Sequence, residues 1–210
     1  MRDLYIFGAG GLGREVEALV SAVNDSGLTW RLAGFLDDAP SPVNRQRVED
    51  LGHQVIGGID HALGRSPQAV VVALADARTR QSVTGRLATA GWQLPALVHP
   101  DTTLGRRVDL SQGALVCAGV RTSTNIRLGK SVVLCANATI GHDVVLGDYS
   151  TVLPGAVVSG EVTLGDASLV GASATILQGL AVGVRATVGA GAVVVRDVPD
   201  EVIVRGVPAR

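Results

Sequence analysis

Aliphatic residues recur every six positions through the second half of the chain, and this period restricts the fold more than any other feature. Of the sixteen positions spaced six apart from residue 104 to residue 194, fifteen are Leu, Ile or Val, and the exception is Thr122. A period of six fits neither an amphipathic helix nor an alternating strand. It predicts a solenoid in which each hexad supplies a short strand with one inward aliphatic side chain. Such hexads bury their apolar side chains by stacking on neighbours, so half the chain forms one rod.

A second period of eighteen residues predicts three faces per coil and about five coils. It is visible in two columns, one of glycine and one of aliphatic residues: Gly129, Gly147, Gly165, Gly183 and Ile126, Val144, Val162, Leu180. Glycine also follows the inward aliphatic residue in eight of the sixteen hexads. We attribute that preference to turns with positive φ. Because an insertion would shift the register, we expect no loop to leave the rod between residues 104 and 194.

Residues 1–98 lack the hexad and predict a separate α/β domain, with 99–210 as the rod domain. Strands and helices alternate there, which indicates a parallel sheet. The expected strands are 4–7, 31–36, 70–75 and 96–98; the expected helices begin at Arg14 and at about Ala77, and the polar stretch 41–49 is expected to be a loop.

A glycine-rich segment, residues 8–13, joins the first strand to the first helix. Small residues there allow a phosphate to reach backbone N–H groups at the helix N-terminus. The spacing Gly8, Gly10, Gly13 also matches the dinucleotide motif, with Asp37 and Asp38 where a ribose-binding acid would lie. The domain is short for a complete dinucleotide fold, so we favour a half-size domain that binds a nucleotide-linked ligand. The alternative is a tight turn that binds nothing.

The ordered motifs of the whole chain resemble one family. They are Gly-Ala-Gly-Gly-Leu-Gly-Arg-Glu at 8–15, Phe-Leu-Asp-Asp at 35–38, Val-His-Pro at 98–100, the hexads, and Gly-Val-Pro-Ala-Arg at 206–210. This set resembles the bacterial sugar acyltransferases of the sialic-acid O-acetyltransferase type, which include acetyltransferases of nucleotide-linked 4-amino sugars. The resemblance implies a half-Rossmann-like domain followed by a left-handed parallel β-helix. It also implies acetyl-CoA as co-substrate and a homotrimer of parallel rods.

The same resemblance implies roles for individual residues. It assigns the base of the sugar nucleotide to Asp37 and Asp38, and coenzyme A to the outside of the rod near Thr151, Ala172 and Ala190. Gly160 would contact the acetyl carbonyl. Phosphates would lie at Gly10, Gly11 and Leu12, and the nucleotide pocket would include Ala75. Relatives often have histidine where Leu12 and Thr151 stand, and glycine where Ala75 stands.

His142 is the candidate general base. It follows the inward Ile140 and Gly141, so it lies at a turn of the coil that solvent reaches. Acyl transfer from a thioester requires removal of a proton from the nucleophile, and an imidazole suits that at neutral pH. The neighbouring Asp143 would raise the basicity of the imidazole, although adjacent side chains need not face each other. Asn137, in the preceding hexad, is a candidate polar contact to the acceptor.

The remaining histidines and both cysteines have structural interpretations. We expect His53 and His61 to be exposed and His99 to make a structural hydrogen bond. Cys117 and Cys135 lie eighteen residues apart and therefore on successive coils, within disulfide range. Packed, reduced thiols are the favoured interpretation for a cytosolic protein.

The composition limits the classes of partner. The net charge of −1 gives no electrostatic footprint for nucleic acid. No apolar run reaches eighteen residues, so no membrane span is expected, and the N-terminal apolar stretch is too short for a signal peptide. We therefore expect a cytoplasmic protein. There is no Cys/His metal-binding spacing, so no metal is expected.

Three functions remain in competition. The favoured one is acetyl-CoA-dependent acetylation of the amino group of a nucleotide-activated 4-amino sugar. The second is O-acetylation of sialic acid or another glycan precursor. The third is a non-catalytic solenoid that binds a ligand or assembles, against which His142 argues because a scaffold needs no base at a turn.

Overall fold

A computed structural model of the chain describes residues 1–27 and 29–210, which form two compact units, Met1–Pro95 and Ala96–Arg210. In the first unit, four parallel strands in the order β3-β2-β1-β4 alternate with helices. The elements are β1 (Arg2–Phe7), α1 (Gly11–Asp25), β2 (Trp30–Leu36), α2 (Pro42–Asp50), β3 (Val55–Gly57), α3 (Ile59–Leu63), β4 (Ala69–Val72) and α4 (Ala77–Thr89).

The first unit is held by an apolar core on the sheet. Strands β1 and β4 are almost entirely buried. Helix α1 packs on β1 and β2, and its buried residues Val16, Leu19 and Val20 recur at helical spacing. Tyr5 and Trp92 meet edge to face with ring centroids 5.5 Å apart.

Two sequence predictions for this unit are wrong. The segment 41–49, expected to be a loop, forms α2. Ser41 caps α2 by accepting a hydrogen bond from the Asn44 N–H at 3.2 Å, and Pro42 begins it. Only Val48 of α2 is buried, so no apolar periodicity reveals it. His53, expected to be exposed, is half-buried against Phe35, with ring centroids 5.9 Å apart.

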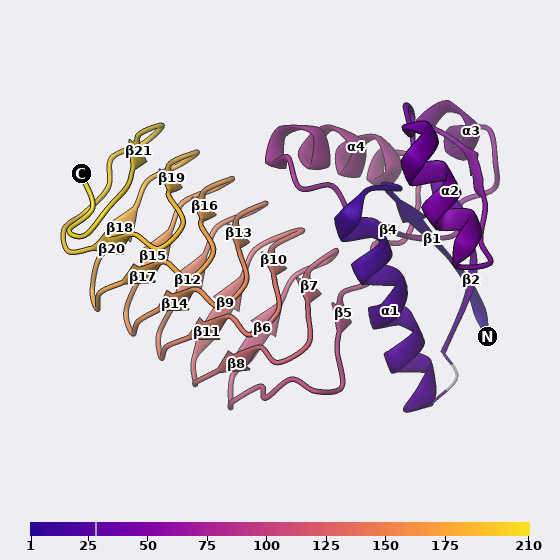
Figure 1. Cartoon of the computed structure of the whole chain (residues 1–210). Helices are drawn as coiled ribbons and strands as arrows, with labels where there is room; N and C mark the ends of the chain where they lie inside the picture. The colour runs from indigo at the N-terminus through magenta and orange to yellow at the C-terminus, as the bar shows by residue number, and fades with distance from the viewer. Residues whose placement is uncertain (28) are drawn as a thin grey trace. The chain divides into compact units, whose positions relative to one another are not determined.

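The second unit is a parallel β-helix whose strands stack into three sheets (Figure 1). The first sheet is β5 (Leu97–Val98), β7 (Leu115–Val116), β10 (Val133–Leu134), β13 (Thr151–Val152), β16 (Leu169–Val170), β19 (Thr187–Val188) and β21 (Ile203–Val204). The second is β8 (Arg121–Thr122), β11 (Thr139–Ile140), β14 (Val157–Val158), β17 (Thr175–Ile176) and β20 (Val193–Val194). The third is β6 (Val108–Leu110), β9 (Ile126–Leu128), β12 (Val145–Leu146), β15 (Thr163–Leu164) and β18 (Ala181–Val182).

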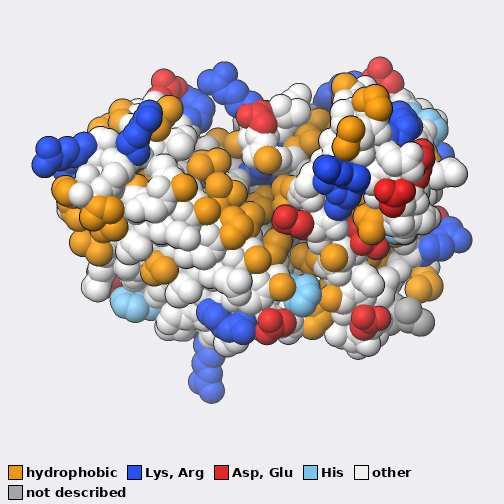
Figure 2. Space-filling view, viewed as in Figure 1, with side chains coloured by type: hydrophobic (Ala, Val, Ile, Leu, Met, Phe, Trp, Pro, Cys, Tyr) orange, Lys and Arg blue, Asp and Glu red, His pale blue; other side chains and the backbone are white. Residues whose placement is uncertain are grey.

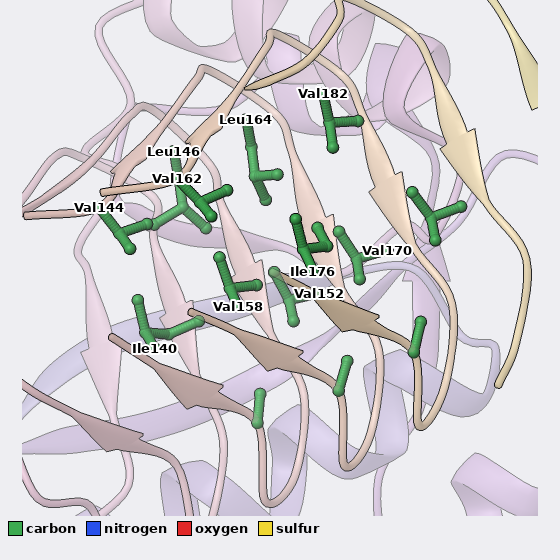
Figure 3. Packing of buried hydrophobic residues seen from close by; sticks show 14 of the residues in the cluster. Ile140, Val144, Leu146, Val152, Val158, Val162, Leu164, Val170, Ile176 and Val182 are labelled. Atoms are coloured by element: carbon green, nitrogen blue, oxygen red, sulfur yellow. The ribbon is translucent and has the colours of Figure 1, made fainter. Parts of the chain in front are cut away.

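The eighteen-residue period sets the strand register. Leu134 pairs with Val152 and Ile140 with Val158, and the other rungs between residues 115 and 194 follow the same offset. The inward aliphatic side chains form one continuous core, part of which is shown in Figure 3. Leu104, the first position of the hexad series, is 38% exposed and lies outside this core. No extended loop leaves the rod between residues 104 and 194, as the unbroken register predicts.

The strand at 96–98 belongs to the rod, which corrects its assignment to the first domain. Leu97 and Val98 pair with Leu115 and Val116 on the next coil. The apolar pattern of so short a strand does not reveal which sheet it joins.

The prediction that glycine follows inward aliphatic residues because of positive φ is also wrong. Positive φ occurs two residues later, at positions such as Ser131 and Asp143, and most of these residues are not glycine. A Cβ on Gly141 would lie 2.4 Å from the backbone nitrogen of Gly160. Glycine is required there because successive coils approach each other closely at the corner.

Apolar side chains also reach the surface (Figure 2). In the rod these include Val145, Leu177, Val195, Ile203 and Val207, which are between 39% and 72% exposed. Cys117 and Cys135 are both buried and are not joined by a disulfide, which agrees with the packing interpretation. The His99 Nδ1 accepts a hydrogen bond from the Asp101 N–H at 3.0 Å, the structural bond expected for it.

Candidate active site

His142 lies at an outer corner of the rod, between β11 and β12. Ile140 and Val144 on either side of it are buried and fix the turn from within. Asp143 adopts a φ of 60°, which closes the turn. The imidazole therefore projects outward, and 46% of its side-chain surface is exposed.

The imidazole of His142 and the carboxylate of Asp143 face each other. Their Nδ1 and Oδ2 atoms are 2.8 Å apart, which settles a pairing that the sequence left open. The Asn125 side-chain amide donates to the other carboxylate oxygen, Oδ1, at 2.5 Å. The hydrogen bond from Asn125, followed by that from His142, holds the pKa of Asp143 below its usual value. With Nδ1 engaged, Nε2 is the nitrogen available to exchange a proton with a substrate.

Gly160 lies directly against this imidazole on the next coil. A Cβ at residue 160 would come within 2.5 Å of the His142 Nε2 atom. Glycine thus allows the ring to rest on the backbone of the neighbouring coil. The structure brings together two of the predicted site residues, His142 and Gly160, which are eighteen residues apart.

Glu161 is a neighbour that the sequence analysis missed. The nitrogen and oxygen atoms of His142, Asp143 and Glu161 that could bind a metal ion all lie within 4.8 Å of one another. Within residues 1–27 and 29–210, no other group of three His, Cys, Asp or Glu side chains comes as close together. Its signal in the sequence is the eighteen-residue spacing from Asp143, which places the two carboxylates in one column.

The residues assigned to coenzyme A do not gather around His142 within one chain. Ala172 and Ala190 stack on successive coils, where the Gly191 N–H donates to the Ala172 carbonyl at 2.8 Å. They share a corner with Asn137, and one face of the rod separates that corner from the His142 corner. Thr151 is buried on β13, in a different sheet from either neighbour of His142.

In the first unit, three loops meet at the carboxyl edge of the sheet. Phe7 at the end of β1 pairs with Leu36 of β2 and with Val72 of β4. The glycine-rich loop, Asp37 with Asp38, and Ala75 follow these three strand ends. The chain order reverses around β1, because β2 and β4 flank it on opposite sides. Ligands of open parallel sheets bind at such a switch point.

The glycines of this loop divide into two kinds. Gly8 and Gly13 are needed for packing, since a Cβ on Gly13 would lie 1.8 Å from the Gly8 carbonyl oxygen. A Cβ on Gly10 or Gly11 would meet no atom within 4 Å. The space above Gly10 and Gly11, at the N-terminus of the fifteen-residue α1, is therefore open to a ligand.

Asp37 and Asp38 hold the loops of this edge in place. Asp37 Oδ2 accepts from the Ala9 N–H at 2.8 Å, and Asp38 Oδ1 accepts from the Ile59 N–H at 2.7 Å. Each carboxylate thus has a structural role that the sequence did not reveal. Each also retains acceptor capacity for a ligand.

Two arginines complete this edge, and the sequence analysis assigned neither. Arg14 Nη1 donates to the Ala9 carbonyl at 2.9 Å and to the Asn44 side chain at 3.1 Å. Arg80 is fully buried and donates to the carbonyls of Leu74 and Ala75, at 2.6 and 3.1 Å. Leu12 lies half-buried in the first turn of α1, between the open glycines and the packed Gly13.

Two family models and several solved structures match the chain. The PglD N-terminal domain matches residues 3–87, and the six-repeat bacterial transferase hexapeptide matches residues 125–160. The acetyltransferase domain of PglB from Neisseria gonorrhoeae FA1090, solved with acetyl coenzyme A, is 32% identical, with a TM-score of 0.86 over 100% of this chain and 98% of that chain. The protein belongs to the bacterial hexapeptide-repeat sugar acetyltransferases.

Two further solved structures are similar to this chain over nearly its whole length. PerB from Caulobacter crescentus, solved with CoA and GDP-perosamine, is 30% identical, with a TM-score of 0.86 over 99% of this chain and 96% of that chain. WeeI from Acinetobacter baumannii AYE is 29% identical, with a TM-score of 0.86 over 100% and 99%. No significant match was found among curated proteins.

The expected architecture of this acetyltransferase is confirmed. An α/β domain precedes a left-handed parallel β-helix built from hexapeptide repeats. Among the described residues, none of the helices has the length and apolar character to cross a membrane.

Proposed function

We propose that this acetyltransferase transfers the acetyl group of acetyl-CoA to the amino group of a nucleotide-activated 4-amino-deoxy sugar in bacterial glycan biosynthesis. The observation that carries the proposal is the imidazole of His142, exposed at the rod surface and bonded through Nδ1 to Asp143. The full-length similarity to PerB, solved with CoA and GDP-perosamine, supports both the reaction and the class of acceptor.

In this mechanism His142 is the general base and Asp143 orients it. The acceptor amine gives a proton to Nε2 as its nitrogen attacks the thioester carbonyl. Asp143 stabilises the imidazolium that forms. The Gly160 backbone contacts the acetyl carbonyl, and the attack is direct, with no covalent enzyme intermediate. Asn137 makes a polar contact to the acceptor in this proposal.

We assign the sugar nucleotide to the carboxyl edge of the first sheet. Gly10 and Gly11 admit the phosphates to the N–H groups at the start of α1, with Leu12 alongside. Asp37 and Asp38 bind the base, and Ala75 borders the pocket. The open space at the two glycines supports this assignment.

We also propose a homotrimer. In one chain, the corner carrying Ala172 and Ala190 is separated by a whole face of the rod from the corner carrying His142. A second parallel copy can place its alanine corner beside the first copy's His142, so that coenzyme A lies between copies along Thr151, Gly160, Ala172 and Ala190. Closed cyclic packing of three such rods completes every site.

The finer family assignment is also a proposal. The motifs at 8–15, 35–38 and 206–210 support the sialic-acid O-acetyltransferase type within the wider family. The cytoplasm is the proposed location of the enzyme, because acetyl-CoA, its proposed co-substrate, is supplied there.

The testing experiment measures acetyl-CoA binding and thiol release with a panel of acceptors. The panel contains 4-amino-4,6-dideoxy sugars linked to GDP, UDP and dTDP, together with sialic acid. Turnover of an amino sugar with amide formation is the expected result. Turnover of sialic acid alone would favour O-acetylation. Neither binding nor thiol release would indicate a non-catalytic solenoid and end the proposal.

A further inference from the structure

Four residues form one column at the His142 corner of the rod. Arg107, Asn125, Asp143 and Glu161 are eighteen residues apart and share nearly the same φ, between 58° and 61°. Neighbours in such a column face each other across about 4.8 Å, the spacing of paired strands. Asn125 and Asp143 use this proximity for a hydrogen bond.

The last step of the column places two carboxylates together. Both oxygens of Asp143 are engaged, by Asn125 and by His142. The Glu161 carboxylate makes no hydrogen bond or ion pair with any described residue, although it lies within 4.8 Å of His142 and Asp143 ligand atoms. Like charges facing each other on neighbouring strands are destabilising. The Glu161 side chain therefore adds no stabilising contact to the fold, whereas its backbone N–H donates to the His142 carbonyl at 2.7 Å.

The surroundings leave the charge of Glu161 uncompensated. Arg107, the basic residue of the column, interacts with Asp143 and lies beyond it, three coils from Glu161. The residue that follows Glu161 in the column is Gly179, which carries no side chain. The carboxylate of Glu161 thus stands beside the His142 imidazole, and no described residue forms an ion pair with it.

We infer that Glu161 binds the ammonium form of the acceptor and thereby selects an amine over a hydroxyl. The inference rests on the proposed function and specifies the acceptor class of the same site. Aliphatic amines are mostly protonated at neutral pH, so the acceptor arrives as a cation that suits an unpaired carboxylate. A sugar hydroxyl is neutral and gains no charge-assisted contact there.

The proton balance of amide formation agrees with this role. The ammonium acceptor loses two protons: one before its nitrogen attacks the carbonyl carbon, and one from the tetrahedral adduct. The N–C bond forms, the C–S bond breaks, and the departing thiolate takes up one proton while the other is released to solvent. Glu161 holds the ammonium beside His142 until the first proton leaves to solvent. His142 Nε2 then receives the second proton from the attacking nitrogen and passes it to the departing thiolate.

The test compares binding of a charged and an uncharged acceptor in Glu161→Gln. The charged probes are the GDP-, UDP- and dTDP-linked 4-amino-4,6-dideoxy sugars. The uncharged probe is the 4-hydroxy counterpart of whichever one is turned over, used as a competitive inhibitor. We expect the KM of the amine to rise about tenfold, which corresponds to about 1.4 kcal/mol. The Ki of the hydroxy counterpart and the KM of acetyl-CoA should stay within about twofold.

The matched control is Glu201→Gln. Glu201 is also an exposed glutamate at positive φ, 62°, but it lies on another corner and pairs with Arg185. The Glu201→Gln substitution removes the same charge from the same rod. The KM of the amine, the Ki of the hydroxy counterpart and the KM of acetyl-CoA should therefore all match the wild type.

Three results would overturn the inference. An unchanged amine KM would remove Glu161 from acceptor binding. An equal rise in the amine KM and the hydroxy Ki would indicate a distorted pocket. Activity lost on chelation and restored by a divalent cation would assign the His142, Asp143 and Glu161 group to a metal. If the wild type binds acetyl-CoA but acetylates no amino sugar, the proposed function fails and this inference fails with it.

Discussion

The Nδ1 atom of His142 lies 2.8 Å from the Oδ2 atom of Asp143, although the two residues are adjacent in the chain. Adjacent side chains in an extended strand point to opposite faces. The corner makes the difference, because Asp143 adopts a φ of 60° and turns its carboxylate back toward the imidazole. The turn that closes the coil therefore also brings the Asp143 carboxylate to the imidazole of the proposed base.

Replacement of that base tests the site most directly. We expect His142→Ala to lower kcat by about 10²–10⁴, because a positioned acid–base group is lost. Acetyl-CoA affinity and the melting temperature should be retained, since the side chain is exposed. Steady-state thiol release per folded protein gives the result. His61→Ala, an exposed histidine of α3, is the control. Turnover of His142→Ala within about threefold of wild type would end the catalytic assignment.

Asp143→Asn should reduce kcat less than His142→Ala does, because the imidazole remains and only its tuning changes. The amide can still bond to the ring, so the fold should be unaffected. The same thiol-release assay ranks the two variants. A loss larger than that of His142→Ala would mean that Asp143 does more than orient the base.

The pKa of Asp143 gives a prediction for pH. Since hydrogen bonds from Asn125 and His142 lower its pKa in the folded state, the stabilising contribution of Asp143 is present above its unfolded value and is lost as pH falls through the lowered folded value. NMR titration of the carboxyl should place its midpoint below the usual aspartate range. Asn125→Ala should raise that midpoint, and an unchanged midpoint would contradict the role of Asn125.

Substitutions in the glycine-rich loop should affect either the stability of the first unit or its affinity for the nucleotide sugar, depending on the position. Gly13→Ala should destabilise the first unit, because its Cβ would overlap the Gly8 carbonyl at 1.8 Å. Gly11→Ala has open space around its Cβ, so the melting temperature should match the wild type while affinity for the nucleotide sugar falls. Thermal unfolding and calorimetric titration measure the two effects. Equal affinity of wild type and Gly11→Ala would remove this loop from the binding site.

Within the rod, Val162→Asp should be far more damaging than Glu161→Ala. Val162 is fully buried in the aliphatic core, and an unpaired carboxylate there costs several kcal/mol. The neighbouring Glu161 is exposed, and its substitution by alanine leaves the hydrogen bond from its backbone N–H to the His142 carbonyl in place. The two melting temperatures check this, and similar values would show that residue 162 does not face the core.

The homotrimer predicts a mass near three times 21.5 kDa. Light scattering at micromolar concentration measures it. We expect the trimer to persist in His142→Ala, whose side chain serves chemistry. A monomer mass for the wild type would leave the residues assigned to coenzyme A on two separate corners of one rod. It would rule out a coenzyme site formed between two copies.

The rod was predictable because its period repeats over ninety residues. Each hexad contributes the same inward aliphatic residue, so Leu134, Ile140 and Leu146 identify three faces without any structure. The glycine loop and the exposed turn at His142 were equally visible, since each combines unusual residue types with a clear position between elements. Long-range repetition and local chain geometry are properties that a sequence carries directly.

Other features depended on contacts between distant residues. Helix α2 has a single buried side chain, Val48, so no apolar pattern marks it; its cap at Ser41 does. Where glycine follows an inward aliphatic residue, it is required by the close approach of the next coil and not by a positive φ.

The candidate site likewise has some features that the sequence predicts and others that depend on contacts between distant residues. The sequence by itself determined the coil, its register and the outward position of His142, because these follow from the spacing of buried residues. Only the tertiary structure decided that the imidazole faces Asp143, rests on Gly160 and has Glu161 beside it. Those contacts join neighbouring coils and a turn with positive φ, and side-chain direction there depends on the backbone angles and on the adjacent coil, neither of which is written in the order of the residues.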